Sequence, residues 1–242
     1  MSLISEQVST SIDALTREFD VIAHNLANAS TIGYKRRCNA FSQSLGTKDP
    51  LSYSPGTIDL NSAFDFSQGT ISQTDRPLDF ALCGKGFFVI ETPTGPLYTR
   101  NGTFLTNQNG QIVDSLGRTV AGEAGPITVP SNVSLLDVAV SSDGSISAGG
   151  IRMGKFRLVD FQDNQNKLIP VGDACYRMPD TTIAPVPAER LVVKQGYQEA
   201  SNVKIIDELV DMILVSRLYE ANMKSLAAEK EASSSLTSAA MG

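Results

Sequence analysis

Residues 196–241 read GYQEASNVKIIDELVDMILVSRLYEANMKSLAAEKEASSSLTSAAM, and they decide how the rest of the chain folds. No Pro or Gly follows Gly196 within this stretch, so about 40 residues can form one helix roughly 60 Å long. Ser201 or Asn202 offers a side chain of the type that caps a helix N-terminus. The stretch therefore predicts one long C-terminal helix.

This predicted helix carries apolar residues on two sides. One stripe consists of Val203, Ile206, Val210, Ile213 or Leu214, Leu218, Ala221, Ala228 and Ala232, and the other of Leu209, Met212, Val215, Tyr219, Met223 and Leu226. Positions two apart point about 200° away from each other, so the stripes lie on nearly opposite faces. A helix that is apolar on both sides must be covered on both sides. A central core helix is the alternative interpretation, but the sequence offers only one other long helix to cover it.

That other helix is predicted from Ser2 to Asn28. Its apolar positions follow a 4-3-4-3-4 spacing and are Val8, Ile12, Leu15, Phe19, Ile22 and Leu26. This spacing is typical of a coiled-coil seam and is narrower than the apolar face of an ordinary amphipathic surface helix, which is the alternative. The C-terminal helix can offer it one stripe. The second stripe then needs another copy of the chain or a relative.

A turn follows the first helix, at residues 27–36. Gly33 can supply the left-handed backbone conformation that ends a helix or completes a type II turn. Asn28 and Thr31 can bond the last free carbonyls or the turn amides. We expect this turn to connect the helix to the rest of the chain.

The same turn resembles the N-terminal signature of the axial proteins of the bacterial flagellum. The residues that fit the pattern Asn-Leu-Ala-Asn-x-x-Thr-x-Gly-Tyr/Phe-Lys are Asn25, Leu26, Ala27, Asn28, Thr31, Gly33, Tyr34 and Lys35. Ile32 stands where that family usually has Pro. The C-terminal stretch is also similar to the family at Gly196, Glu199, 201–203, 208–210, 212–213 and 219–222.

The middle of the chain changes from polar to strand-like. Residues 37–75 are rich in Ser, Thr, Gln and Asp with Pro and Gly breakers, which indicates an extended connecting segment. Short β runs then follow, among them 87–90, 97–99, 111–113, 127–129 and 155–159. Asn-Gly and Asp-Gly pairs lie between or beside them as turn formers. Many short strands with dense turns predict a mostly antiparallel β domain.

The predicted fold class is α+β, with long N- and C-terminal helices packing as a coiled-coil-like stem and a central, mostly antiparallel β domain. The predicted domains are an N-terminal stem helix and turn at 1–36, an extended connecting segment at 37–75, a β-rich domain at 76–195 and a C-terminal stem helix at 196–242.

Within the middle region the resemblance becomes narrower. Residues 78–82 followed by 86–88, and then 98–102, are similar to rod and hook proteins generally. Residues 122–130 and 154–159 look more like the proximal rod protein than the distal one. The resemblance implies a structural subunit of the flagellar basal-body rod that polymerises through its terminal helices. It also implies a place in the rod crossing the periplasm, and export through the flagellar type III channel without a cleaved signal peptide.

Composition and motifs argue against other classes of protein. A net charge of −6 and a pI near 4.9 disfavour nucleic-acid binding. No run of about 18 apolar residues predicts a membrane span. Three cysteines with no metal spacing, and one histidine, His24, predict neither a disulfide framework nor a metal site. We expect no catalytic residues, no cofactor and no small-molecule substrate.

We therefore expect assembly with copies of this chain and with other flagellar rod and hook axial proteins. The predicted assembly interface comprises Val8, Ile12, Leu15, Phe19, Ile22, Leu26, Val203, Ile206, Leu209, Val210, Met212, Ile213, Leu218, Tyr219, Met223 and Leu226. The predicted hinge or turn residues are Asn28, Thr31, Gly33, Tyr34, Ser201 and Asn202. The alternatives are a distal rod or other axial protein, a monomeric β-domain binding module or adhesin, and an extracytoplasmic hydrolase, for which the sequence offers no polar cluster.

Overall fold

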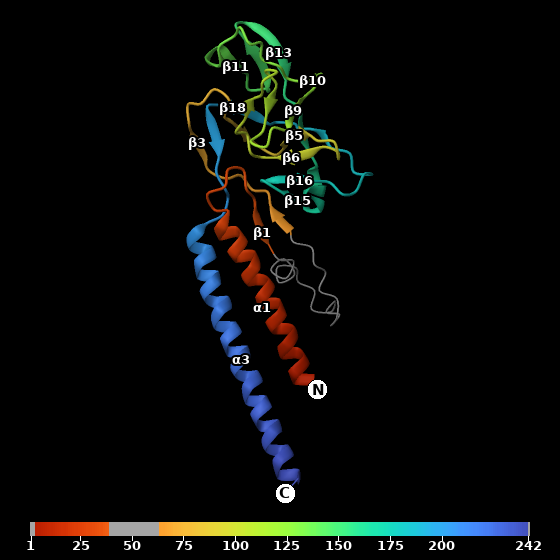
Figure 1. Cartoon of the computed structure of the whole chain (residues 1–242), viewed down its shortest axis with the longest axis vertical. Helices are drawn as coiled ribbons and strands as arrows, with labels where there is room; N and C mark the ends of the chain where they lie inside the picture. The colour runs from red at the N-terminus through yellow and green to blue at the C-terminus, as the bar shows by residue number, and fades with distance from the viewer. Residues whose placement is uncertain (1–2, 39–62, 242) are drawn as a thin grey trace. The chain divides into compact units, whose positions relative to one another are not determined.

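The computed structural model describes residues 3–38 and 63–241 and divides the chain into two units (Figure 1). The β unit comprises residues 30–36 and 63–202. The helical unit comprises the described residues among 1–29, 37–62 and 203–242. Residues 39–62, which make up most of the connecting segment predicted at 37–75, lie outside the described residues.

The helical unit consists of α1 (Leu3–Ala27) and α3 (Ile205–Met241), which run alongside each other in Figure 1. At the end of α1 the Asn28 side chain donates a hydrogen bond to the His24 carbonyl at 2.8 Å. This contact satisfies one of the carbonyls that the last helical turn leaves without an intrahelical partner. α3 begins at Ile205, three residues after the last predicted capping residue, Asn202.

The predicted coiled-coil-like stem is wrong, although both terminal helices are present. A coiled coil buries apolar side chains at both seam positions along both helices. In α1 the predicted seam residue Phe19 remains 39% exposed, and in α3 Ile206 remains 75% exposed. The completely buried residues on the two helices include the polar side chains Asn25 and Glu208, which bond to each other at 3.3 Å. α1 covers only one side of α3, and a polar pair occupies part of that side.

The β unit is built from short strands. Those entering it are β1 (Arg36–Cys38), which spans the boundary between the units, β2 (Ala63–Asp65), β3 (Ile71–Gln73) and β4 (Phe80–Cys83). The central strands are β5 (Phe87–Glu91), β6 (Leu97–Thr99), β7 (Leu105–Thr106), β8 (Ile112–Val113), β9 (Thr119–Gly122) and β10 (Gly125–Pro126). Next come β11 (Val138–Val140), β12 (Ser145–Ala148), β13 (Ile151–Lys155) and β14 (Leu158–Asp160). The last are β15 (Ile169–Gly172), β16 (Cys175–Arg177), β17 (Val186–Pro187), β18 (Val192–Gln195) and β19 (Tyr197–Glu199). Two 3₁₀ helices, Leu135–Asp137 and Gln162–Lys167, interrupt the strands.

The largest sheet has ten strands along the path β15-β16-β6-β5-β9-β8-β7, with β10, β14 and β17 attached beside it. β11, β12 and β13 form a separate sheet, while β4 pairs with β18 and β3 with β19. These pairings within the β unit are antiparallel, as the sequence predicted. The last two pairings join strands from opposite ends of the unit's sequence.

The core of the β unit lies on both faces of β5. Phe88 and Ile90 belong to one buried cluster, and Phe87 and Val89 belong to the other. Successive side chains of a strand point to opposite faces, so a strand covered on both faces is apolar at every position. This explains why the run at 87–90 shows no polar alternation and was still recognisable as a strand.

Candidate functional site

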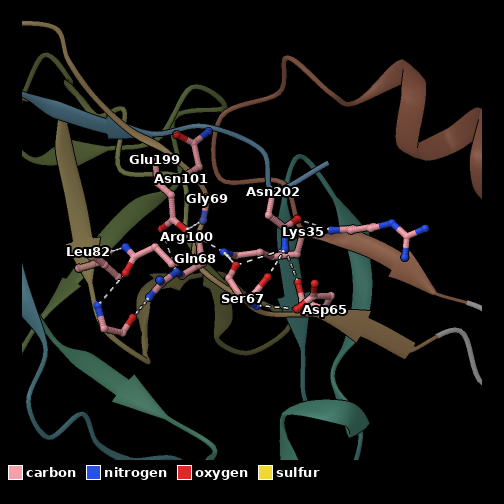
Figure 2. Close-up of polar contacts among 12 residues, drawn as sticks. Lys35, Asp65, Ser67, Gln68, Gly69, Leu82, Arg100, Asn101, Glu199 and Asn202 are labelled. Carbon is pink, nitrogen blue, oxygen red and sulfur yellow. Dashed lines mark hydrogen bonds and ion pairs between the residues drawn. The ribbon is translucent and has the colours of Figure 1, made fainter. Parts of the chain in front are cut away.

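Three charged side chains meet in the interior of the β unit (Figure 2). Glu199, the last residue of β19, accepts a hydrogen bond at Oε1 from Lys35 Nζ at 2.7 Å and from the Gly69 amide at 3.0 Å. Its Oε2 lies 3.0 Å from Arg100 Nε, but the N–H is not aligned with the oxygen, so this contact is ionic only. Lys35 and Glu199 are 0% exposed and Arg100 is 3% exposed. Buried charges are tolerated when they are paired, so Glu199 permits both cations to be buried.

The two cations have further partners among backbone carbonyls. Lys35 Nζ donates to Ser67 O at 2.6 Å, while Arg100 Nη1 donates to Gly84 O at 2.8 Å and to Gly86 O at 2.7 Å. Burial lowers the pKa of the Lys35 ammonium; Glu199 opposes that lowering and Arg100 adds to it. With two cations and one carboxylate, the group depends on Glu199 for its charge balance.

Gly33 approaches this group through its backbone. It has φ +70°, the left-handed conformation expected of it, and its amide donates to the carbonyl of Glu199 at 2.8 Å. A Cβ at this position would lie 2.4 Å from the Asn101 nitrogen and 2.6 Å from the Arg100 carbonyl carbon. Glycine is therefore required here for its conformation and also for its small size.

Asn202 connects the two ends of the β unit. Its Oδ1 accepts a hydrogen bond from the Arg36 amide at 2.7 Å, and its Nδ2 donates to Asp65 O at 2.8 Å and to Ser67 Oγ at 3.1 Å (Figure 2). Because these bonds occupy both ends of the amide, Asn202 joins segments of the β unit and does not cap α3. Ser201 beside it is buried.

The remaining predicted turn residues lie within residues 30–36 or just before them. Tyr34 is buried, and its amide donates to the Thr31 carbonyl at 3.3 Å. The amide of Asn28 donates to the carbonyls of both His24 and Asn25, at 3.2 and 3.1 Å. A hinge role for these residues stays a prediction.

In the helical unit, the Asn25 side chain bonds to the backbone of Arg37, which follows the turn. Its Oδ1 accepts from the Arg37 amide at 2.8 Å, and its Nδ2 donates to the Arg37 carbonyl at 2.9 Å. The same Nδ2 lies 3.3 Å from Glu208 Oε2. One amide side chain thus pairs with the backbone of a distant residue and with the first turn of α3.

The predicted interface residues of α3 divide between two sides of the helix. Val215 is buried and Met212 and Leu226 are half-buried, on the side that also carries Glu208. At about 100° per residue, positions nine apart lie on opposite sides, which places Ile206 opposite Val215. The exposed apolar residues on that opposite side, which we call the outer face, are Ile206, Leu209, Val210, Ile213 and Leu214. Leu218, Tyr219 and Met223 are also exposed but lie away from the centre of the outer face, and Val203, just before α3, is buried.

The predicted interface residues of α1 are less exposed than those of α3. Ile22 is buried, and Val8, Ile12, Leu15 and Leu26 are half-buried. Phe19 is the only one of this set that is exposed. A substitution at Ile22 would therefore disturb the helical unit itself, whereas one on the outer face of α3 would not.

Among residues 3–38 and 63–241, no group of three or more His, Cys, Asp or Glu side chains is placed to hold a metal ion. In the same described part of the chain, no helix combines the length and the apolar character needed to cross a bilayer.

Known proteins match the chain at both the β unit and α3. Residues 81–148 match the model of the flagellar hook protein FlgE/F/G D1 domain, and residues 194–239 match that of the flagellar basal body rod FlgEFG protein C-terminal region. The flagellar basal-body rod protein FlgG of Buchnera aphidicola subsp. Acyrthosiphon pisum is 33% identical over 242 residues, covering 90% of this chain and 92% of the relative. The flagellar basal-body rod protein FlgF of Caulobacter vibrioides is 34% identical over 220 residues, covering 88% of this chain and 87% of the relative. The chain belongs to the flagellar basal-body rod protein family.

Membership in this family confirms the predicted function. The chain is a structural subunit of the bacterial flagellar basal body and not an enzyme. The buried group around Glu199 is accordingly part of the architecture, and the outer face of α3 is the candidate surface for assembly.

Glu199 and Lys35 were predicted only as positions that resemble the family, and their pairing was not predicted. They are separated by 164 positions, so no local pattern connects them. An available signal was the combination of a Lys after the turn glycine and a Glu inside a short strand of otherwise polar and small residues.

Proposed function

We propose that the chain polymerises with copies of itself and with other axial proteins of the rod through the outer face of α3, assisted by Phe19 of α1. The observation that carries this proposal is the exposure of five apolar side chains at the start of α3. Leu209, the least exposed of the five, is 43% exposed, and Ile206 is 75% exposed. A long helix that leaves its apolar side in water is stabilised when a partner covers that side.

The magnitude of this contact indicates how assembly proceeds. Burying an apolar side chain completely contributes about 1.5–3 kcal/mol, and roughly half of each surface is still available here, so five residues contribute about 4–8 kcal/mol. Association costs an estimated 4–15 kcal/mol in lost freedom of motion. A single contact of this kind is therefore weak. Several simultaneous contacts within a polymer overcome that cost, since the first contact raises the effective concentration of the next.

The position in the rod is part of the same proposal. Residues 122–130 and 154–159 favour the proximal rod, as part of a shaft that crosses the periplasm. Export as an unfolded chain through the flagellar type III channel is consistent with Cys83 and Cys175, which form no disulfide. A heterologous contact that does not close on itself produces a filament, as a rod requires.

Replacement of Ile213 by Asp in the full chain tests the proposal. The variant is expressed in a strain that lacks the chain, and basal bodies are examined by electron microscopy. We expect no incorporation into rods, because an unpaired carboxylate would be buried at the contact. Lys224→Ala, on nearly the same side of α3 but beyond the apolar residues, is the control and should be incorporated normally. Normal rods with Ile213→Asp would refute the proposal.

A further inference from the structure

We propose that Glu199 is a positioning residue: through Gly33 and Lys35 it holds residues 30–36 as an integral part of the β unit. The segments leading to α1 and from β19 toward α3 would then be fixed at one shared anchor. This role concerns the single chain and does not depend on how subunits assemble.

Glu199 contacts the segment at two points. Its carbonyl oxygen accepts from the Gly33 amide at 2.8 Å, and its Oε1 accepts from Lys35 Nζ at 2.7 Å. The same Oε1 accepts from the Gly69 amide at 3.0 Å. One residue thus bonds both to the N-terminal segment and to the chain just before β3.

The Ser67 carbonyl oxygen is contacted by both segments, through Lys35 and Asn202. Lys35 Nζ donates to the Ser67 carbonyl at 2.6 Å, and Asn202 Nδ2 lies 3.2 Å from the same oxygen. Asn202 also accepts from the Arg36 amide at 2.7 Å. The segment that enters the β unit and the segment that leaves it are therefore bonded to each other and to the same third segment (Figure 2).

The charge balance determines what would move if Glu199 were neutral. Lys35 and Arg100 would then be two buried cations without the carboxylate that contacts both, which is strongly unfavourable although Asp65 still acts on Lys35 from further away. Arg100 follows β6 directly and donates to the carbonyls of Gly84 and Gly86, so the sheet holds it in place. Lys35 lies on residues 30–36, a seven-residue stretch that is separate in the sequence from the rest of the unit, residues 63–202. That stretch can leave and hydrate its ammonium group while the sheet stays folded.

Amide hydrogen exchange on the full chain carrying Glu199→Gln tests this inference. We expect the Gly33 and Gly69 amides to exchange more than about tenfold faster and to lose most of their protection, whereas the amides of β5, although accelerated by the lower stability of the unit, remain protected. Glu123→Gln is the matched control, because Glu123 pairs with Lys155 at 3.1 Å on the surface of the same unit. It should leave all of these rates unchanged.

The double variant Lys35→Met/Glu199→Gln separates positioning from a general contribution to stability. Removing the Lys35 charge together with that of Glu199 leaves Arg100, which still donates to the Gly84 and Gly86 carbonyls, and should restore protection of Gly33 to within about tenfold of the wild type. If Glu199→Gln alone fails to fold, the double variant carries the test, since it is required to fold. Unchanged exchange at Gly33 in Glu199→Gln, loss of protection in β5 together with Gly33, or no rescue by Lys35→Met would each overturn the inference.

Discussion

Replacing Gly33 with Ala is expected to destabilise the β unit by about 2–4 kcal/mol, compared with about 1 kcal/mol for Gly117→Ala. The two glycines have similar backbones, with φ +70° and φ +78°. A left-handed conformation costs a residue with a Cβ about 1–2 kcal/mol, and the reduced freedom of the unfolded chain offsets about 0.4–1 kcal/mol of that. The conformational contribution is thus nearly the same at both positions.

The two positions differ in the space around them. A Cβ at Gly33 would lie 2.4 Å from the Asn101 nitrogen, whereas one at Gly117 would meet nothing within 4 Å. The atoms near Gly33 belong to the backbone and cannot rotate away, so the segment or the loop must shift. Overpacking of this kind typically costs about 1–3 kcal/mol. The difference between the two variants isolates this close approach.

Urea unfolding of both full-length variants measures the difference. The chain contains no Trp, so tyrosine dominates the emission; Tyr98 and Tyr176 are buried in the β unit and become exposed when it unfolds, whereas Tyr219 on α3 is already exposed. In a thermal melt, the same loss of 2–4 kcal/mol lowers the melting temperature by roughly 2–4 °C for each kcal/mol in a domain of this size. Equal destabilisation by Gly33→Ala and Gly117→Ala would refute the conclusion that residues 30–36 are packed against the loop after β6.

Three further predictions concern other parts of the chain. Glu199→Gln should lower the free energy of unfolding of the β unit by about 3–5 kcal/mol, as measured by urea titration. Glu123→Gln should lower it by less than about 1 kcal/mol. Equal losses for the two variants would contradict the conclusion that Glu199 belongs to a buried ionic group. Burial raises the pKa of the Cys175 thiol, so its reactive thiolate is scarce below that raised pKa. A thiol reagent at mildly alkaline pH should therefore modify half-buried Cys83 well before buried Cys175 in the folded protein. In urea the difference in rate between the two thiols should disappear. Asn25→Ala should lower the free energy of unfolding of the helical unit by about 1–3 kcal/mol and leave the β unit unchanged, because it removes the partner of the half-buried Arg37 backbone groups and of buried Glu208. A loss seen equally in both units by circular dichroism and tyrosine emission would contradict this.

Local patterns in the sequence were sufficient where neighbouring residues decide the structure. The apolar run at 87–90 is β5, and residues 97–99 are β6. The Asn109-Gly110 pair does lie in the turn between β7 and β8, where Gly110 has φ +73°. Each of these features depends on contacts between residues close together in the chain, which composition and spacing reveal.

Patterns failed where the deciding contact is distant. Asn202 has the chemistry of an N-cap, but Arg36 and Ser67 occupy its side chain, and α3 begins at Ile205 instead. The regular seam spacing of α1 predicted a coiled coil, yet spacing on one helix does not specify what the other helix presents. Here α3 presents Glu208 to Asn25.

The β unit buries a group of charged side chains, whereas α3 exposes apolar ones. The residues that stabilise a single subunit are therefore different from those that we propose assemble it. In the β unit, Lys35 and Glu199 are withdrawn from water, at a cost in desolvation that is offset by their mutual contact and by their contacts with Ser67, Gly69 and Arg100. In α3, Ile206 and Ile213 stay in water although the same helix buries Val215 on its other side. Burying those isoleucines within one chain would require a further helix, which another subunit can supply in a rod. Substitutions at the buried group should therefore change the unfolding of an isolated subunit, while substitutions on the outer face should leave unfolding unchanged and prevent incorporation.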